Sequence, residues 1–241
     1  FRVDEEGERV PLTIAAADRE KGTVTIIFQK VGLSTQRLGA LSQGEGILDF
    51  VGPLGEPSRL EGIGNAAMVG GGLGVAIAYP QAKALRALGA RVEGILGFRE
   101  KGLIVLEEEM RAVCHAVYVT TDDGSNGHRG FVTDVLRRRM EEGAGYDAVL
   151  AMGPLPMMKA VAELTRPFGI RTIVSMNPIM IDGTGMCGGC RVTVGGETKF
   201  ACVDGPEFDG HLVDFDEAIA RSRMYREEER HACRLMGGEG S

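Results

Sequence analysis

The sequence predicts three consecutive parts: an incomplete antiparallel β barrel in residues 1–61, a parallel α/β domain in residues 62–177, and a small cysteine-rich region with a C-terminal helix in residues 178–241. Before residue 62, strand-like runs follow one another without helical patterns, which favours an antiparallel sheet. After it, apolar strands alternate with helices, as in a parallel sheet covered on both faces. A Cys-x2-Cys-x11-Cys pattern marks the third part.

The composition excludes several classes of function. A net charge of −7 argues against a nucleic-acid-binding surface, and the absence of tryptophan argues against a base-stacking platform. The longest apolar stretch, residues 66–79, is too short to cross a bilayer. The five cysteines are mostly clustered in a glycine-rich segment, which does not resemble a disulfide framework. We therefore expect a protein of the reducing cytoplasm, with no membrane and no nucleic-acid partner.

The first part contains three strand-like segments, at residues 10–15, 23–30 and 46–51. Polar or glycine-containing stretches separate them. Three strands cannot close a barrel, because a hydrogen-bonding edge would stay unpaired. The pattern therefore predicts only part of a barrel.

The second part opens with a buried strand at residues 66–69, a turn Gly-Gly-Gly-Leu-Gly at residues 70–74 and an apolar helix at residues 75–88. In this arrangement backbone N–H groups and the helix dipole can meet a pyrophosphate. The turn differs from the Rossmann G-x-G-x-x-G pattern, so its interpretation depends on the units that follow.

Those units complete the pattern of a parallel sheet. Further strands are expected at residues 91–97, 116–121, 148–152 and 171–175, a strand edge with a helix at 103–110, and helices at 131–142 and 156–165. Ligands of such sheets gather at the carboxyl ends of the strands. Gly97, Arg99, Asp123 and the Gly153-Pro154 turn lie at such ends. Arg99 is the candidate contact for a nucleotide phosphate or ribose, with a surface ion pair as the alternative.

Three of the five cysteines, Cys187, Cys190 and Cys202, form the third part's central motif. The glycines among residues 183–189 permit positive φ angles, so that backbone N–H groups can turn toward a negatively charged centre. Residues 191–194 and 198–202 alternate as two short strands around a Gly-Gly turn. This predicted hairpin returns Cys202 to the side of the loop.

A fourth ligand is needed, because iron–sulfur clusters and structural zinc sites normally take four protein ligands. Asp182 stands five residues before Cys187, where a C-x4-C-x2-C loop places its first cysteine. Its carboxylate is ionised at neutral pH and can bind iron. We interpret Asp182, Cys187, Cys190 and Cys202 as a [2Fe–2S] site. A zinc knuckle or a loop of reduced thiols is the alternative, and Cys114 and Cys233 are not expected to be ligands.

The chain resembles one family along almost its whole length. The segments Asp182-Gly-Thr-Gly-Met-Cys-Gly-Gly-Cys-Arg-Val-Thr-Val and Phe200-Ala-Cys-Val-Asp-Gly-Pro-Glu-Phe-Asp-Gly-His211 are similar to the C-terminal motif of the small flavin/iron–sulfur subunit of NADH-dependent reduced ferredoxin:NADP oxidoreductase, also known as sulfide dehydrogenase β subunit. The wider family includes the electron-transfer subunit of dihydroorotate dehydrogenase and, more distantly, ferredoxin–NADP reductases. The dihydroorotate members use four cysteine ligands, so Asp182 favours the ferredoxin:NADP branch.

The resemblance implies a ferredoxin–NADP reductase-like fold with an FAD-binding barrel. The family's barrel begins upstream of the segments present here, so we expect its first strands to be missing from this sequence, which puts FAD retention in question. The residues that match the family's flavin-contacting elements are Arg9, Pro11, Leu12, Thr13, Phe28, Gln29, Lys30, Gly32, Ser34 and Thr35. The last three belong to the segment Gly32-Leu33-Ser34-Thr35, which matches the family's phosphate turn, where N–H groups and a hydroxyl at a helix start can hold a pyrophosphate.

The same resemblance implies a pyridine-nucleotide site, with NAD(H) favoured over NADP(H). The matching residues are Gly70, Gly71, Gly72, Gly74, Gly97, Arg99, Asp123, Gly153 and Pro154. In many relatives a cysteine precedes the Gly-Pro turn, where this chain has Met152. A helix is expected at residues 215–233, and His211 is expected to form hydrogen bonds or an interface rather than to bind the cluster.

The function that follows is electron transfer between NAD(H), FAD and the [2Fe–2S] cluster. A larger flavin/iron–sulfur subunit would be the partner in a heterodimer or higher assembly, and ferredoxin would be reached indirectly through electron bifurcation. The first alternative is the electron-transfer subunit of NAD-dependent dihydroorotate dehydrogenase. The second is a zinc-containing nucleotide-binding module, which would be colourless.

Overall fold

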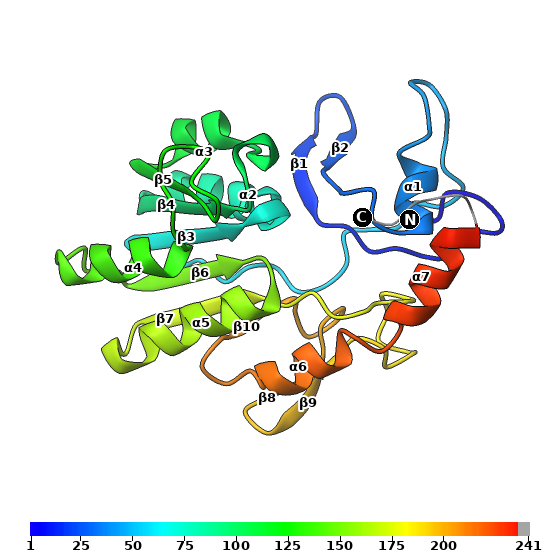
Figure 1. Cartoon of the computed structure of the whole chain (residues 1–241). Helices are drawn as coiled ribbons and strands as arrows, with labels where there is room; N and C mark the ends of the chain where they lie inside the picture. Colours follow the sequence, from blue (N-terminus) through cyan, green and yellow to red (C-terminus); the bar gives the residue numbers. More distant parts are fainter. Residues whose placement is uncertain (236–241) are drawn as a thin grey trace.

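The computed structural model describes residues 1–235, except for some side chains of the last helix. Its centre is a six-stranded sheet in the order β10-β7-β6-β3-β4-β5 (Figure 1). The strands are β3 (Asn65–Gly71), β4 (Arg91–Phe98), β5 (Ala116–Thr121), β6 (Ala148–Met152), β7 (Arg171–Ser175) and β10 (Glu207–Asp209). All neighbours are parallel except β10, which pairs antiparallel with β7. The predicted parallel sheet is therefore confirmed.

The strand order places a topological switch point in the middle of the sheet. From β3 the chain adds β4 and then β5 on one side, and it afterwards returns to add β6 and then β7 on the other side. The connections after β3 and β6 therefore leave in opposite directions from adjacent strands. In open parallel sheets, ligands bind in the crevice at such a point.

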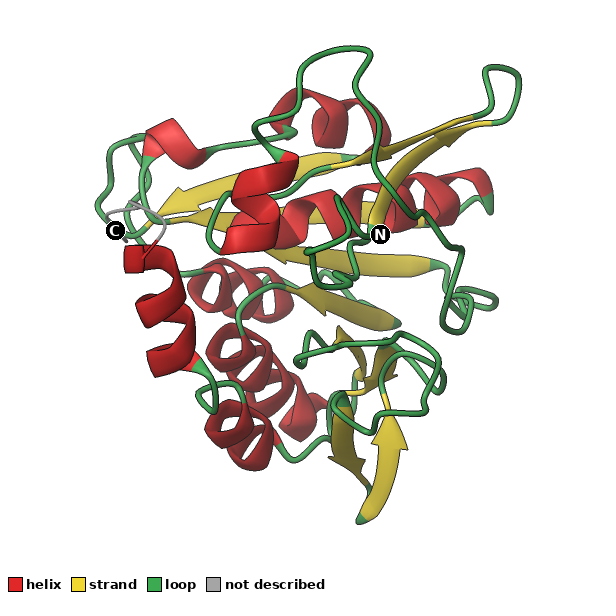
Figure 2. Cartoon of the chain, turned by 90° about the vertical axis from the view of Figure 1, so that its right-hand side faces the viewer, coloured by secondary structure: helices red, strands yellow, loops and turns green. Residues whose placement is uncertain are grey.

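Helices cover both faces of the sheet (Figure 2). One face carries α2 (Val75–Ala87) and α3 (Glu107–Val113), and the other carries α4 (Val132–Glu141) and α5 (Leu155–Thr165). The alternation within β3 explains how one strand serves both layers: Ala66 and Met68 pack with α2, whereas Ala67 and Val69 pack with α4 and α5. All four side chains are fully buried, as expected for a strand between two layers of helices.

Short 3-10 turns connect several of these elements. They are η1 (Gly72–Gly74), η2 (Lys101–Leu103) and η3 (Arg166–Phe168). The prediction of a strand edge near residue 103 is wrong. After β4 the chain forms the 3-10 turn η2 and then enters α3 at Glu107. Leu106, the residue before α3, has a φ of 56°, a left-handed conformation that ends any extended run.

The N-terminal segment contains an antiparallel pair, β1 (Ile14–Asp18) and β2 (Thr23–Ile26), and the short helix α1 (Leu33–Leu38). The third predicted strand, at residues 46–51, is wrong: only an isolated bridge joins Arg2 and Asp49 there. Phe50 and Val51 are 52% and 67% exposed, so no opposing layer buries this run. Residues 1–61 therefore form a hairpin with loops, and the predicted partial barrel is not formed in the described chain.

The C-terminal region begins with a loop that leads into the hairpin β8 (Arg191–Val194) and β9 (Glu197–Phe200). The single helix predicted at residues 215–233 is wrong, because two helices, α6 (Phe215–Arg221) and α7 (Arg226–Leu235), are present. Ser222 ends α6, and its hydroxyl donates to the Ile219 carbonyl at 2.8 Å, a local bond that competes with helix continuation. α7 lies beside α1 (Figure 1).

β10 joins this C-terminal region to the central sheet, because Glu207 pairs with Ser175 of β7. The division of the chain at residues 61/62 and 177/178 stays a prediction. No helix in the described part of the chain is both long and apolar enough to pass through a bilayer.

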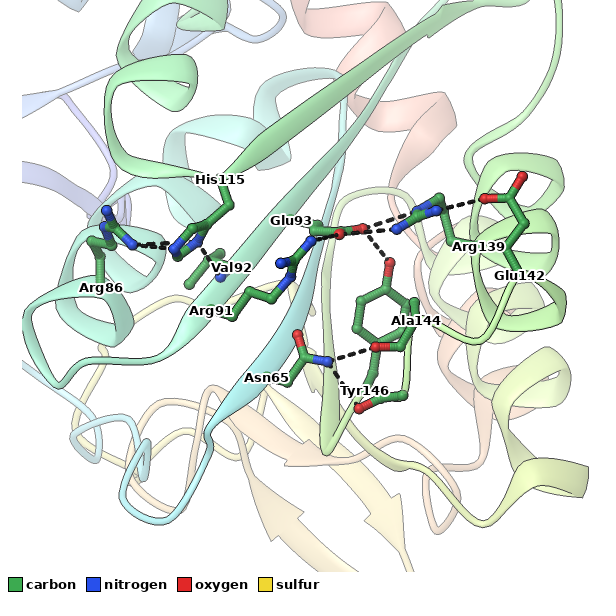
Figure 3. Close-up of polar contacts among 11 residues, drawn as sticks. Asn65, Arg86, Arg91, Val92, Glu93, His115, Arg139, Glu142, Ala144 and Tyr146 are labelled. Carbon is green, nitrogen blue, oxygen red and sulfur yellow. Dashed lines mark hydrogen bonds and ion pairs between the residues drawn. The ribbon is translucent and has the colours of Figure 1, made fainter.

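At the amino ends of the parallel strands a buried carboxylate sits in an ionic network (Figure 3). Glu93 of β4 is 1% exposed and accepts two bonds of 3.0 Å from the Arg139 guanidinium, one of 2.9 Å from Arg91 and one of 2.7 Å from the Tyr146 hydroxyl. Burial alone would raise the pKa of Glu93, but these three donors outweigh it and lower the pKa to about 2. The network ties β4 to α4 at the amino ends of the strands, opposite the carboxyl ends where the switch point lies.

Candidate functional site

The turns after β3 and β6 meet at the switch point. A Cβ on Gly74 would lie 2.2 Å from the Met152 carbonyl oxygen, and one on Gly153 would lie 3.0 Å from the Gly71 oxygen. A Cβ on Gly71 would in turn lie 3.0 Å from Pro154. Glycine is therefore required here for backbone contact between the two turns.

The same turn leads directly into a helix. Gly72 has a φ of 53° with open space around it, and α2 begins at Val75 with Gly74 as its N-cap. No side chain caps this helix start, so the N–H groups of its first turn have no capping partner from a side chain. A helix start of this kind at the carboxyl end of a strand is suited to a phosphate group.

The neighbouring candidates have different surroundings. Gly97 lies within the sheet, and a Cβ there would be 2.6 Å from Val132 of α4, so packing already requires glycine. Arg99 is exposed after the end of β4 and forms no ion pair within residues 1–235, against the surface ion-pair alternative. The Asp123 carboxylate accepts from the Ser125 N–H and hydroxyl at 2.9 and 2.7 Å. Roles of all three toward a nucleotide stay predictions.

The flavin candidates are spread over the N-terminal hairpin and its flanks. Arg9, Pro11 and Thr13 are exposed just before β1, whereas Leu12 is half-buried. After β2, Phe28 is half-buried and both Gln29 and Lys30 are exposed. These two groups flank the β1–β2 pair at its open end, where Ile14 pairs with Ile26, and their roles toward a flavin stay predictions.

The phosphate turn predicted around Gly32 has a capping role in this structure. The Thr35 hydroxyl accepts from the N–H groups of Val31 and Gly32 at 3.0 Å and donates to the Gly32 carbonyl at 2.9 Å. Ser34 is half-buried in the first turn of α1. The Thr35 hydroxyl therefore already accepts from the Gly32 N–H, which belongs to the predicted phosphate turn, and from the Val31 N–H before it.

The cysteine loop is closed by the β8–β9 hairpin, as predicted. The register pairs Arg191 with Phe200, so Cys190 lies opposite Ala201 and next to Cys202 just outside that pair. The Ala201 N–H donates to the Cys190 carbonyl at 3.2 Å, and the Cys190 thiol donates to the Cys202 sulfur at 3.2 Å. Both cysteines are buried, with 1% and 6% exposure.

Asp182 and Cys187 form a second pair at the exposed side of the loop. The Asp182 carboxylate accepts from the Thr184 and Cys187 N–H groups, each at 2.8 Å. Gly183 and Gly185 between them have φ angles of 77° and 84°, which turn these N–H groups inward. The bond from Thr184 is the main cause that lowers the pKa of Asp182, so the carboxylate is ionised and able to act as a ligand.

The four candidate ligands thus lie in one loop as two pairs. Within the described residues, no three His, Cys, Asp or Glu side chains surround one common position for a metal ion. A structural zinc ion takes four ligands around a single centre, which this arrangement does not provide. A [2Fe–2S] cluster has two irons, each with two protein ligands, and fits the pairs Asp182–Cys187 and Cys190–Cys202 better.

The protonation state of the thiols bears on how such a centre forms. Burial is the main cause that raises the pKa of Cys202 to about 11, with the neighbouring Cys190 thiol adding to it. The Cys202 thiol therefore carries its proton at neutral pH when no metal is present. Metal binding has to release this proton, and it supplies the positive charge that makes burial of a thiolate favourable.

The remaining candidates and two further residues complete the site. His211 contacts the Thr165 hydroxyl at 3.0 Å, which confirms its expected hydrogen-bonding role. Cys114 packs against the α2 side of the sheet, and the Cys233 side chain lies outside the described ones. Sequence reasoning missed Arg191 and Arg221, whose guanidinium groups contact the cysteine loop. Only the position of Arg191 next to Cys190 hinted at this.

Comparison with known proteins identifies the family. Residues 177–214 match the iron–sulfur cluster binding domain of dihydroorotate dehydrogenase B. A dihydroorotate dehydrogenase B (NAD(+)) electron transfer subunit homolog from Thermotoga maritima is 47% identical over 230 residues, which cover 95% of this chain and 81% of the relative. The dihydroorotate dehydrogenase B (NAD(+)) electron transfer subunit of Bacillus caldolyticus is 38% identical over 208 residues, 83% of this chain and 77% of the relative.

A solved structure extends the similarity to the whole fold. The chain is similar to a chain in the structure of an NADH-dependent reduced ferredoxin-NADP oxidoreductase, with a TM-score of 0.92, 46% sequence identity, and coverage of 98% of this chain and 84% of that one. The fold is accordingly ferredoxin–NADP reductase-like in its parallel α/β sheet and its C-terminal iron–sulfur binding region. Identity and coverage together show that this chain belongs to the dihydroorotate dehydrogenase B electron transfer subunit family.

Proposed function

We propose that this chain carries electrons between NAD(H), FAD and a [2Fe–2S] cluster, and exchanges them with a larger flavin/iron–sulfur partner subunit. The observation that carries the proposal is the pairing of Asp182 with Cys187 and of Cys190 with Cys202 inside the matched iron–sulfur region. Two pairs of anionic ligands in one loop are what a two-iron centre requires. The cluster supplies one-electron transfer when it is bound.

The turns at the carboxyl ends of the parallel strands support the nucleotide part of the proposal. The glycine turns after β3 and β6 lie in backbone contact at the switch point, and α2 starts there without a side-chain cap. These features hold a pyrophosphate in other open parallel sheets. Arg99, which is exposed just after the end of β4, would contact the rest of an NAD(H) molecule.

The flavin part of the proposal rests on the N-terminal hairpin and on the relatives. FAD when bound converts a two-electron hydride into single electrons. In this chain Arg9, Thr13 and Lys30 would contact it, from the exposed flanks of β1 and β2. The Thr35 hydroxyl already caps α1. We therefore assign the contacts to the FAD phosphates to the exposed residues that flank β1 and β2, and to Ser34 in preference to Thr35.

Within the family we propose the ferredoxin:NADP branch, in which the complex couples NADH, NADP and ferredoxin by electron bifurcation in the cytoplasm. Two observations support this choice: the carboxylate of Asp182 at the first ligand position, and the TM-score of 0.92 to the NADH-dependent reduced ferredoxin-NADP oxidoreductase chain. The second candidate is the electron-transfer role for a dihydroorotate dehydrogenase. Its support is the 38% identity to the Bacillus caldolyticus subunit.

The test uses the native complex, purified anaerobically through a tag on this chain. The proposal predicts a co-purifying larger subunit and a reduction of NADP by reduced ferredoxin that depends on NADH. Oxidation of dihydroorotate with NAD as acceptor would favour the second candidate instead. A protein that is colourless, contains zinc and has neither activity would contradict both candidates.

A further inference from the structure

Two arginines hold the short segment between Cys187 and Cys190. The Arg191 guanidinium donates to the Gly188 carbonyl at 3.2 Å, and the Arg221 guanidinium donates to the Gly189 carbonyl, also at 3.2 Å. Gly188 has a φ of 67°, so these two peptide groups have a conformation that a non-glycine residue would rarely adopt. Each of the two carbonyls between the cysteines is therefore bound by a cationic side chain.

The bond from Arg191 acts on a cysteine sulfur through one peptide group. The Gly188 carbonyl and the Gly189 N–H belong to the same planar unit. While the carbonyl accepts from Arg191, the N–H donates to the Cys187 sulfur at 3.4 Å. A guanidinium on the carbonyl polarises this unit and strengthens the donor on its other side. Hydrogen bonds to the sulfurs are one of the factors that set the potential of an iron–sulfur centre.

Arg221 reaches the loop from another element. It is in the last turn of α6, a helix that packs on α5 and β8. α5 begins just after the Gly153-Pro154 turn at the nucleotide edge, and its first residue, Leu155, lines the same cavity of about 250 Å³ as Cys187 and both arginines. The orientation of the second peptide group is thus fixed by a helix anchored to the nucleotide-binding half.

Neither arginine has its charge neutralised nearby. Among the side chains that the structure describes, no carboxylate forms an ion pair with Arg191 or Arg221. Four anionic ligands give the loop a negative charge, and one added electron increases it. Two unneutralised cations at the backbone of the loop therefore favour the reduced over the oxidised state.

We propose that Arg191 and Arg221 are positioning residues that orient the Gly188 and Gly189 peptide groups and raise the reduction potential of the cluster in this loop. The inference rests on the proposed function, because it presupposes that the loop holds the [2Fe–2S] cluster. It adds residues that are not ligands to the electron-transfer site.

The experiment is an EPR-monitored redox titration of the full-length holoprotein and of the variants Arg191→Gln, Arg221→Gln and Arg191→Lys. We expect each glutamine variant to disfavour reduction by about tenfold, which is a lowering of about 59 mV for one electron. Arg191→Lys keeps the charge but not the planar fork, so it should recover part of the shift. Arg166→Gln is the matched control, because Arg166 also donates to a backbone carbonyl, that of His211, outside the loop.

The outcomes distinguish a failure of the role proposed for the two arginines from a failure of the proposed function. If both glutamine variants keep wild-type iron content and the wild-type potential, the inference is overturned while the proposed function stands. If Arg191→Gln folds with wild-type circular dichroism but loses iron that Arg166→Gln retains, the orienting role of Arg191 is supported. If the wild-type protein itself contains no iron and sulfide, the proposed function is overturned and the inference with it.

Discussion

The two ends of the parallel strands differ in how their polar groups are satisfied. At the amino end, the buried Glu93 accepts from Arg91, Arg139 and Tyr146, all within the chain. At the carboxyl end, the turns after β3 and β6 contain glycines in contact with backbone, and α2 starts without a side-chain cap. The Glu93 carboxylate at the amino end has all its donors within the chain, whereas the helix start at the carboxyl end has no side-chain cap.

This difference separates stability from function along the same sheet. A buried charge that keeps all its partners holds β4 to α4 and to the start of β6, and it leaves nothing for a ligand to bind. A bare turn and helix start contribute little to stability but leave N–H groups for an anion. We therefore expect substitutions at the amino end to change unfolding, and substitutions at the carboxyl end to change binding.

The largest effect is expected from Arg139→Met, which removes two of the bonds to Glu93. It leaves a nearly fully buried carboxylate with Arg91 and Tyr146, and breaking a buried ion pair in this way costs about 3 kcal/mol of unfolding free energy. Urea unfolding measures it. Arg138→Met, on the adjacent exposed position with only a 3.9 Å contact to Glu142, is the control and should change little. Equal losses in the two variants would show that the network does not stabilise the sheet.

Acid should weaken the same end of the sheet. The pKa of Glu93 is lowered from 4.5 to about 2, so its contribution is fully present above pH 4.5 and is lost as the pH falls toward 2. The shift corresponds to about 3 kcal/mol. Urea unfolding of wild type and Glu93→Gln at several pH values between about 5 and 3 tests this. The variant should lose less stability over this interval, and identical slopes would contradict the assignment.

A smaller effect on stability, but a larger one on binding, is expected from Gly74→Ala at the carboxyl end. The new Cβ would lie 2.2 Å from the Met152 carbonyl oxygen, so the two turns have to separate, at a cost of about 1–3 kcal/mol. NADH affinity should fall as well, because the helix start moves. Gly46→Ala, where a Cβ meets nothing within 4 Å, is the control for both measurements. Unchanged NADH affinity would remove this turn from the proposed site.

The smallest effect on stability is expected from Lys159→Met, in α5, away from both ends of the strands. Its ammonium is 2.7 Å from Asp216 and joins α5 to α6, but the Asp216 side chain is 82% exposed. Exposed pairs contribute little to stability. Lys83→Met, an exposed position on α2, is the comparison in thermal or urea unfolding. A loss of stability as large as that of Arg139→Met would mean that the α5–α6 contact depends on this charge.

The parallel strands of the central sheet could be predicted from the sequence because they are mostly apolar runs that alternate with helical patterns. Every strand from β3 to β7 lies where this alternation placed it. The structure of residues 1–61 could not be predicted in the same way, and the strand expected at residues 46–51 is not formed, because strand formation there depends on neighbouring strands rather than on local pattern. The helix break at Ser222 depends on one side-chain bond, and nothing in the amphipathic pattern around it signals that bond.

The cysteine loop was predictable in its ligands but not in its surroundings. The spacing from Asp182 to Cys190 and the Gly-Gly turn of the hairpin suffice to bring Cys202 to Cys190. The division into two pairs, and the contact of Arg221 with the loop, depend on tertiary packing of α6 that no local spacing encodes.

The central claim is that the C-terminal region of the chain carries a two-iron centre in the segment from Asp182 to Cys202. It is tested most directly by metal and acid-labile sulfide analysis of anaerobically purified protein, with low-temperature EPR after reduction. The account predicts iron and sulfide in equal amounts and an EPR signal of a reduced [2Fe–2S] cluster that disappears in Cys190→Ala. Zinc without sulfide, and no EPR signal after reduction, would contradict it.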